Sequence, residues 1–256
     1  MSGQNTAVTL EVNGRIATVT LNRPEKRNAL SEKIFDGLRQ AFASLPDAVR
    51  AVVIHGAGDH FCAGLDLAEH KHAAPFQSVL NSRDGHRLFA DIQNCGHPVI
   101  SAMHGAVIGG GMELVASTHI RVADRTAFYQ LPEGRRGIFI GGGGSVRVAK
   151  IIGVSRLTEM MLTGRRLDAD EGERLGLSHE MVEPGQALER ALEIAENVAG
   201  NAPISNYMML QALANIDQMP DAAGLFAESL AQALTLTTGD AKEGIDAFLQ
   251  KRSAQF

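Results

Sequence analysis

Two apolar runs, residues 8–12 and 16–21, flank an Asn13-Gly14 pair near the start of the chain. An Asn-Gly pair between β-rich runs is the strongest short-range signal for a tight hairpin. We therefore expect the chain to begin with two antiparallel strands. The period then becomes helical over residues 31–43. Ser31 is placed as the N-cap, and one face of this helix carries the apolar side chains of Ile34, Phe35, Leu38 and Phe42.

Short apolar runs continue to alternate with helical patterns over the first 150 residues. Buried strands are expected at residues 51–55, 98–103 and 120–123, and a helix at 83–94. Leu65 and Asp66 follow a glycine-bearing turn and are expected to begin a further helical segment. The segment 68–82 is polar and poorly periodic, so it is expected to form a mobile loop over a site.

After Gly153 the chain reads as successive helices with one weak strand at residues 178–182. This change predicts an α/β core of repeated ββα units over residues 1–195 and a helical extension over 196–256. The six expected helices cover residues 155–162, 168–175, 186–199, 204–216, 224–236 and 241–251.

Composition narrows the functional classes. With 256 residues and 45% hydrophobic content, the chain can bury a sizeable core. A formal net charge of −5, with scattered Lys and Arg, argues against a nucleic-acid footprint. Only two cysteines occur, without a CxxC pair, so neither a disulfide framework nor a thiolate metal cluster is indicated. No apolar run reaches the length of a membrane span, and no signal peptide is evident. These features predict a soluble cytoplasmic protein.

The most informative stretch, residues 101–147, places two glutamates beside two glycine-rich turns. A helix that opens with the glycines at 109–111 would present unpaired N–H groups and the positive end of its dipole. Glu113 lies in the first turn of that helix, and Glu133 precedes a second glycine run at 141–144. The pattern suggests paired carboxylates beside a preorganised oxyanion site.

Less specific interpretations remain for these residues. Glu113 alone could be only a favourable charge at a helix N-terminus. A phosphate cradle is disfavoured because the chain contains neither GxxxxGK[ST] nor a GxGxxG fingerprint here. The histidines at positions 70, 72 and 86 lack a fixed zinc-ligand spacing, so solvent exposure is expected and no metal is predicted.

Several ordered motifs together identify a family resemblance. They are RNAL at 27–30, FCAGLDL at 61–67, HGAVIGGGMEL at 104–114, LPEGRRGIFIGGGGSVR at 131–147 and LTGRRLDADEGERLGL at 162–177. With these motifs, nearly the whole chain resembles the crotonase, or enoyl-CoA hydratase/isomerase, superfamily. The resemblance implies a spiral core of ββα units and a C-terminal helical trimerisation region. It also implies an acyl-CoA substrate, no separate cofactor, and homotrimers that can pair into hexamers.

The resemblance also implies roles for individual residues. The backbone N–H groups of Leu65 and Gly110 would form the oxyanion hole, and Glu113 and Glu133 would be the two catalytic acids. Candidates for binding CoA are Lys26, Arg27, Ala29, Ala63, Asp66, Leu67 and, from a neighbouring subunit, Lys251. Lys26 and Arg27 could equally be ordinary surface cations, and Asp66 could instead cap a helix.

The acyl pocket would involve Arg136, Ile140 and Gly141. Arg135 and Arg136 replace residues that are apolar in many hydratases, and Ile140 occupies a common proline position. A guanidinium in the pocket would favour a polar or acidic acyl group, whereas a surface ion pair is the alternative. The tract 131–153 also resembles a bacterial branch that includes methylthioacryloyl-CoA hydratases.

The expected function is hydration of a 2-enoyl-CoA, with Glu113 activating water and Glu133 serving the α-carbon. On methylthioacryloyl-CoA, thioester hydrolysis could follow hydration. The alternatives on the same fold are an enoyl-CoA isomerase and an acyl-CoA thioester hydrolase. From another class, a noncatalytic CoA-binding or scaffold protein remains open.

Overall fold

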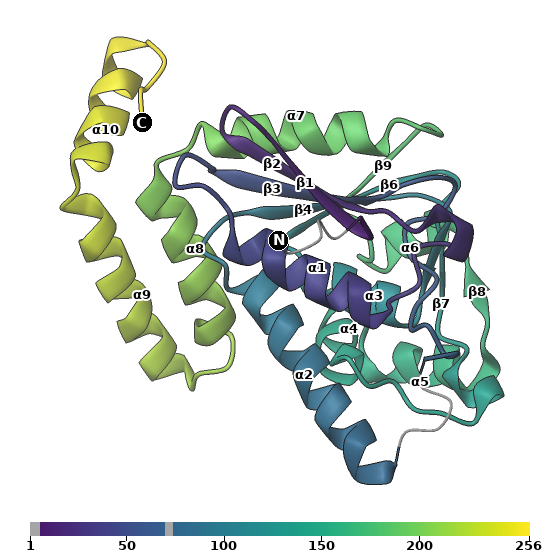
Figure 1. The fold of residues 1–256 in the computed structure, drawn as a ribbon. Helices are drawn as coiled ribbons and strands as arrows, with labels where there is room; N and C mark the ends of the chain where they lie inside the picture. The colour runs from purple at the N-terminus through teal and green to yellow at the C-terminus, as the bar shows by residue number, and fades with distance from the viewer. Residues whose placement is uncertain (1–5, 70–73) are drawn as a thin grey trace.

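The computed structural model describes residues 6–69 and 74–256, which form two sheets and surrounding helices (Figure 1). The larger sheet has the strand order β1-β2-β3-β4-β6-β9, and all its pairs after the first are parallel. Its strands are β1 (Val8–Asn13), β2 (Ile16–Leu21), β3 (Ala51–Gly56), β4 (Val99–Met103), β6 (Ile120–Asp124) and β9 (Glu180–Val182).

The N-terminal hairpin is confirmed. Strands β1 and β2 pair antiparallel from Val8 opposite Leu21 to Asn13 opposite Ile16. Gly14, at the turn, has a φ of 58°, a conformation that glycine adopts without strain. The hairpin thus sets the edge from which the parallel strands are added.

Helices cover both faces of the larger sheet (Figure 1). On one face, α7 (Ala187–Ala199) packs through Ala187, Ala191, Ala195 and Ala199, which bury a smooth alanine stripe at helical spacing. On the other face lie α1 (Glu32–Ala43), α2 (Pro75–Gln93) and α3 (Gly110–Val115). Ser31 caps α1 as expected, because its side chain accepts the Ile34 N–H at 3.4 Å.

A smaller sheet lies beside this helical layer and has the order β5-β7-β8. Two isolated parallel bridges lie outside the main strand pairs. One joins Leu30 to Leu65, and the other joins Cys62 to Val107 of the smaller sheet. The elements of this part are β5 (Ala106–Ile108), β7 (Phe128–Gln130), β8 (Arg166–Leu167), the 3-10 helices η1 (Pro24–Lys26) and η2 (Glu133–Arg136), and the helices α4 (Gly144–Ile152), α5 (Val154–Thr163) and α6 (Ala169–Arg174).

Two local predictions are wrong. No helix begins at Leu65 and Asp66, because Leu65 pairs in extended form with Leu30 and the chain then turns over residues 67–69. The expected loop at 68–82 is helical from Pro75 onward, since proline at the first helical position is preorganised and α2 then packs on α1. The residues 70–73, with two of the histidines, lie outside the described part of the chain.

Three further helices end the chain: α8 (Pro203–Ile216), α9 (Asp221–Leu236) and α10 (Gly239–Gln250). Helices α8 and α9 pack side by side, while α10 stands away from the sheets at the left of Figure 1. Helix α7 runs through the predicted boundary at residue 195, so the helices that leave the core begin with α8. Within residues 6–69 and 74–256, no helix combines the length and apolar character needed to cross a bilayer.

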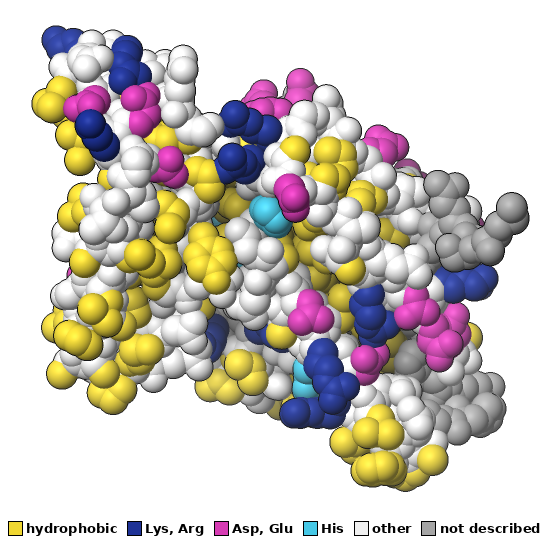
Figure 2. Space-filling view, turned by 60° about the vertical axis from the view of Figure 1, so that its left-hand side comes forward, with side chains coloured by type: hydrophobic (Ala, Val, Ile, Leu, Met, Phe, Trp, Pro, Cys, Tyr) yellow, Lys and Arg dark blue, Asp and Glu magenta, His cyan; other side chains and the backbone are white. Residues whose placement is uncertain are grey.

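Apolar side chains gather over the α8–α9 pair on the left of Figure 2. Large exposed apolar patches on a protein surface commonly mark interaction sites. Assembly into trimers through this region stays a prediction. The exposed side chains include Tyr207, Met209, Leu213, Leu225, Phe226, Leu230 and Leu234.

Asn28 fixes the turn between β2 and α1. Its side chain is fully buried, and its backbone has a positive φ of 56°. Oδ1 accepts the Arg23 N–H at 2.8 Å, while Nδ2 donates to the carbonyls of Ala57 and His60 at 2.9 and 2.7 Å. One amide therefore connects three separate backbone positions next to the segment that contains Leu65.

We predict that Asn28→Ala lowers the free energy of unfolding by about 2 to 4 kcal/mol, because it leaves buried backbone groups without partners. The measurement is urea unfolding followed by circular dichroism. Asn22→Ala is the matched control, since Asn22 makes one exposed hydrogen bond to Thr6. Equal, small losses for both variants would contradict this role of Asn28.

Candidate active site

A cavity of about 730 Å³ lies between α1, α2, the start of α3 and the segment at residues 138–142. Eight of the residues expected at the site line it. They are Leu65, Leu67, Gly110, Glu113, Glu133, Arg136, Ile140 and Gly141. The fold therefore brings together residues that are separated by up to 76 positions in the sequence.

Two backbone segments run side by side along one wall. Gly64 and Asp66 make the hydrogen bonds to Leu30, so the Leu65 N–H points away from that bridge. A methyl group placed on Gly110 would lie 3.5 Å from the Leu65 nitrogen, and one on Gly64 would lie 3.3 Å from the Gly110 nitrogen. The N–H groups of Leu65 and Gly110 thus border the same small space.

Glycine is required at this wall because the chains approach so closely. Gly64 has a φ of 91°, and a methyl group there would lie 2.8 Å from the Ile108 carbonyl oxygen. Gly109 has a φ of 51°, and a methyl group there would lie 2.9 Å from Glu133 Oε1. A side chain at Gly64 would collide with the backbone at Ile108 and crowd the Gly110 nitrogen, and one at Gly109 would crowd Glu133.

Glu113 occupies the first turn of α3 and is only 6% exposed. Its Oε1 accepts the N–H groups of Gly142 at 2.6 Å and Gly144 at 2.9 Å. Burial raises the pKa of Glu113 to about 7, and the charge of Glu133 raises it as well, whereas the two N–H donors and Arg147 oppose the increase. This carboxyl group can therefore exchange a proton near neutral pH.

Glu133 begins η2 and is also 6% exposed. Its Oε1 lies next to Gly109, while its Oε2 is buried without a hydrogen-bond partner within the described residues. Burial raises the pKa of Glu133, which the nearby Arg136 opposes. Burial therefore makes this carboxyl group harder to ionise than an exposed one, and its Oε2 is available to a bound molecule.

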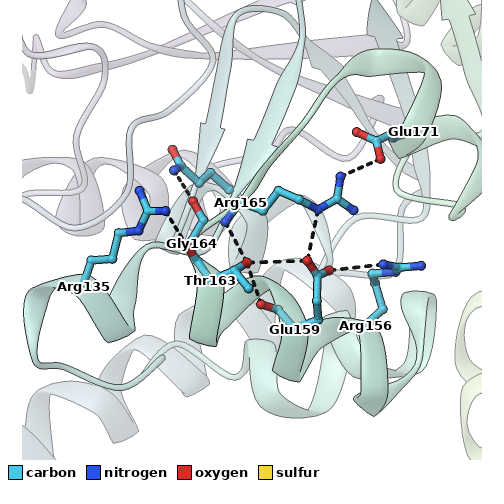
Figure 3. Close-up of polar contacts among 8 residues, drawn as sticks. Arg135, Arg156, Glu159, Thr163, Gly164, Arg165 and Glu171 are labelled. Atoms are coloured by element: carbon cyan, nitrogen blue, oxygen red, sulfur yellow. Dashed lines mark hydrogen bonds and ion pairs between the residues drawn. The ribbon is translucent and has the colours of Figure 1, made fainter.

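The turn at residues 163–164 holds the segment that carries Glu133 (Figure 3). Arg135 donates to the Thr163 carbonyl, and Gln130 Nε2 donates to the Gly164 carbonyl at 2.7 Å. Arg165 then connects this turn to its surroundings, because it contacts Glu159 at 3.0 Å and Glu171 at 2.7 Å. Arg135 thus has a structural contact outside the cavity.

Arg136, by contrast, lines the cavity close enough to act on Glu133. The two arginines that the sequence left undecided therefore have different surroundings. The opposite wall carries Phe35 and Phe89, whose rings stack with centroids 6.2 Å apart. The cavity combines this apolar wall with two arginines, Arg136 and Arg39, of which Arg39 pairs with Asp36 at 2.9 Å and with Asp84.

The expected CoA-binding residues fall into two groups. Ala29 and Ala63 lie on neighbouring segments, since the Ala63 N–H donates to the Arg27 carbonyl at 2.9 Å. Lys26 and Arg27 are exposed beside them. Lys251 is the C-cap of α10 and does not line the cavity of its own chain.

Asp66 has structural contacts although the predicted helix is absent. Its carboxylate lies 3.2 Å from Arg23 Nη1 and accepts the Ala68 N–H at 3.3 Å. It therefore stabilises the turn that follows Leu65.

Sequence reasoning missed the residues that hold Glu113. The glycine run at 141–144 was visible, but nothing in it indicated that the N–H groups of Gly142 and Gly144 reach a glutamate about 30 positions away. The α2 residues Ser82, which contacts Gly141 in this run, and Gln93, which contacts Arg147 just after it, carried no local signal at all.

Comparison with known proteins identifies the family. A family model described as enoyl-CoA hydratase/isomerase matches residues 11–256. The short-chain-enoyl-CoA hydratase of Clostridium acetobutylicum is 32% identical over 251 residues, covering 97% of this chain and 96% of that protein.

Solved structures agree. A Rhodopseudomonas palustris protein with a provisional enoyl-CoA hydratase assignment is 47% identical, with a TM-score of 0.94 over 97% of this chain and 96% of that one. An enoyl-CoA hydratase from Bacillus anthracis is 31% identical, with a TM-score of 0.92 over 98% of each chain. These structures confirm the expected fold, with its α/β core and C-terminal helices.

We predict that Glu113→Gln is more stable relative to the parent protein at pH 8 than at pH 4.5. A pKa raised to about 7 means that protonated Glu113 favours the folded state, and that this contribution is lost as the pH rises through 7. Glutamine cannot lose a proton. The stability difference between variant and parent should therefore grow by about 2 to 3 kcal/mol across this range.

Urea unfolding at both pH values measures this change, and Glu228→Gln on the exposed surface of α9 controls for the substitution itself. A difference that is constant between pH 4.5 and 8 would show that burial does not shift the pKa of Glu113.

Proposed function

Because the chain belongs to the enoyl-CoA hydratase/isomerase family, we propose that it adds water across the C2=C3 double bond of a 2-enoyl-CoA thioester. The observation that carries this proposal is that two buried carboxyl groups line the same cavity as Leu65 and Gly110, whose backbone N–H groups are the proposed donors. The substrate supplies the CoA, so the reaction needs no separate cofactor.

The thioester carbonyl oxygen would lie against the N–H groups of Leu65 and Gly110. Attack of water at C3 moves the electron pair of the double bond toward C2 and the thioester oxygen, which gives an enolate. Donors already oriented toward that oxygen stabilise its developing charge by about 3 to 4 kcal/mol each. Backbone donors suit this task because packing fixes their direction.

Glu113 would take the proton of the attacking water, and Glu133 would give a proton to C2. The surroundings support this division. The N–H groups of Gly142 and Gly144 stabilise Glu113 when it is ionised, and Glu133 has a buried oxygen without a hydrogen-bond partner among the described residues that is available to a bound molecule. The proton gained by Glu113 must return to Glu133 before the next turnover.

An isomerase would instead move a proton between C2 and C4, for which one acid–base group is enough. A second buried carboxyl group in the same cavity favours hydration over isomerisation. It also disfavours a purely noncatalytic CoA-binding role, because two buried acids cost stability without aiding CoA binding.

The CoA portion would follow the edge formed by Lys26–Leu30 and Ala63–Leu67, where Lys26 and Arg27 can meet phosphates. Lys251 would serve the site of a neighbouring subunit. The exposed apolar side chains of α8 and α9 support a homotrimer, or a hexamer of two trimers.

The acyl group would extend toward Phe35, Phe89 and Ile140, with Arg136 available to a polar substituent. Methylthioacryloyl-CoA fits this description as one candidate. Hydration at C3 would then give a hemithioacetal that releases methanethiol and leaves an aldehyde. Thioester hydrolysis could follow in the same cavity.

The test is incubation with crotonyl-CoA and, separately, methylthioacryloyl-CoA, with loss of enoyl absorbance, free thiol and product masses measured. We expect 3-hydroxybutyryl-CoA from the first substrate. Glu113→Gln and Glu133→Gln should each lower kcat by about 10²- to 10⁴-fold, because each removes a proton-transfer group. Full activity after either change would point to a single-acid reaction such as isomerisation.

Methanethiol and free CoA from the second substrate would support the branch that also hydrolyses the thioester. A stable 3-hydroxyacyl-CoA would exclude that branch. Inactivity toward both substrates would reject hydration of short acyl groups.

The oxyanion hole can be tested with a pair of variants at one position. Leu65→Pro removes the N–H, whereas Leu65→Ala keeps it and changes only the side chain. Because the donor acts on the developing charge, we expect Leu65→Pro to lose about 10²- to 10³-fold in kcat. Leu65→Ala should retain most of its kcat.

Circular dichroism and CoA binding verify that both variants are folded. Equal losses for the two variants would mean that the leucine side chain matters and the N–H does not.

A further inference from the structure

One face of α2 is turned toward the glycine run at 141–144. Ser82, His86, Phe89 and Gln93 are spaced by four, three and four residues, so they lie on the same side of the helix. All four contact, or lie next to, the segment from Gly141 to Arg147. That segment holds Glu113.

Ser82 makes the shortest of these contacts. Its Oγ donates to the Gly141 carbonyl oxygen at 2.6 Å. The Gly142 N–H, which donates to Glu113 Oε1 at 2.6 Å, belongs to the same peptide group as that carbonyl. A peptide group is planar and rigid, so holding its oxygen also fixes the direction of its N–H.

The first turn of α4, which follows the run, is held from α2 as well. Arg147 Nε donates to Gln93 Oε1 at 2.9 Å. A methyl group placed on Gly143 would lie 2.5 Å from Arg147 Nη1 and 3.6 Å from His86 Cδ2. Residues 141–144 have no side chains beyond Cα with which to fix themselves, so contacts from outside the run must orient their N–H groups.

We propose that Ser82 is a positioning residue for Glu113, because it orients the Gly141–Gly142 peptide whose N–H holds the carboxylate in the cavity. The proposal rests on the function proposed above only in treating Glu113 as the group that activates water. The hydroxyl donation also polarises the peptide, which strengthens its N–H as a donor.

The other groups around Glu113 define what a change at Ser82 can do. Glu133 and Arg147 face it with opposite effects on its pKa, and Gly144 supplies the second N–H. His86 Nε2 lies 3.4 Å from Ser82 Oγ. Since the Ser82 proton goes to Gly141, His86 can only donate to that oxygen. With these groups unchanged, loss of the hydroxyl weakens one donor to Glu113.

The test compares Ser82→Ala with Ser82→Thr, which keeps the hydroxyl group. Gln77→Ala is the control on α2, since the Gln77 side chain donates to Asn81 Oδ1 at 2.8 Å and does not line the cavity. The first readout is the pH profile of kcat/KM with crotonyl-CoA. We expect Ser82→Ala to move the acid limb upward by about half to one pH unit.

Ser82→Thr should restore the parent profile, and Gln77→Ala should not move it. A second readout needs no turnover. For each protein, the free energy of unfolding is measured against pH with and without Glu113→Gln. The pH dependence of the difference reports the pKa of Glu113 in the folded state. Ser82→Ala should raise that pKa by the same amount as it moves the acid limb.

An unchanged pKa of Glu113 in Ser82→Ala would overturn the proposal, even if activity or melting temperature falls, because such losses would be merely structural. A raised pKa that Ser82→Thr restores would support it. If the parent protein does not hydrate crotonyl-CoA but the stability readout shows this shift, the positioning role holds while the proposed hydratase function fails for that substrate.

Discussion

The arrangement of the site depends on how a buried carboxylate is accommodated. An ionised carboxyl group removed from water costs several kcal/mol unless hydrogen bonds replace the lost hydration. For Glu113, the N–H groups of Gly142 and Gly144 are that replacement. Side chains at these positions would collide with Glu113 itself or with Ile140, so a glycine run is the only kind of segment that can approach this closely.

A run of glycines has little intrinsic order, and the surrounding structure has to supply it. Helix α2 contacts the run from one side through Ser82, and Arg147 at the start of α4 contacts α2 through Gln93. Helix α2 is in turn packed against α1, with Phe35 and Phe89 stacked between the two helices, and its Leu88 and Ile92 are buried in the hydrophobic core. Helix α2 thus links the packing of the hydrophobic core to the position of the glycine run.

The two glutamates have different hydrogen-bonding environments within the same cavity. Both are buried to the same extent, yet Glu113 accepts two N–H groups while Glu133 has an oxygen without a partner among the described residues. Hydrogen bonding to the ionised form favours ionisation, and burial without it favours the acid. At Glu113 burial outweighs the two donors, because its pKa is still raised to about 7, and burial raises the pKa of Glu133 as well.

The sequence by itself determined the hairpin at Asn13-Gly14, the cap at Ser31 and most helices, because turn chemistry and side-chain period act over a few residues. Its ordered motifs also indicated the family and the residues that line the cavity. Local pattern failed at residues 65–66 and 75–82, where pairing with Leu30 and packing on α1 override it. Only the tertiary structure decided which N–H groups meet Glu113, which arginine faces the cavity and how α2 holds the glycine run. These contacts join positions about 30 to 60 residues apart, and glycine carries no side chain from which such a contact could be inferred.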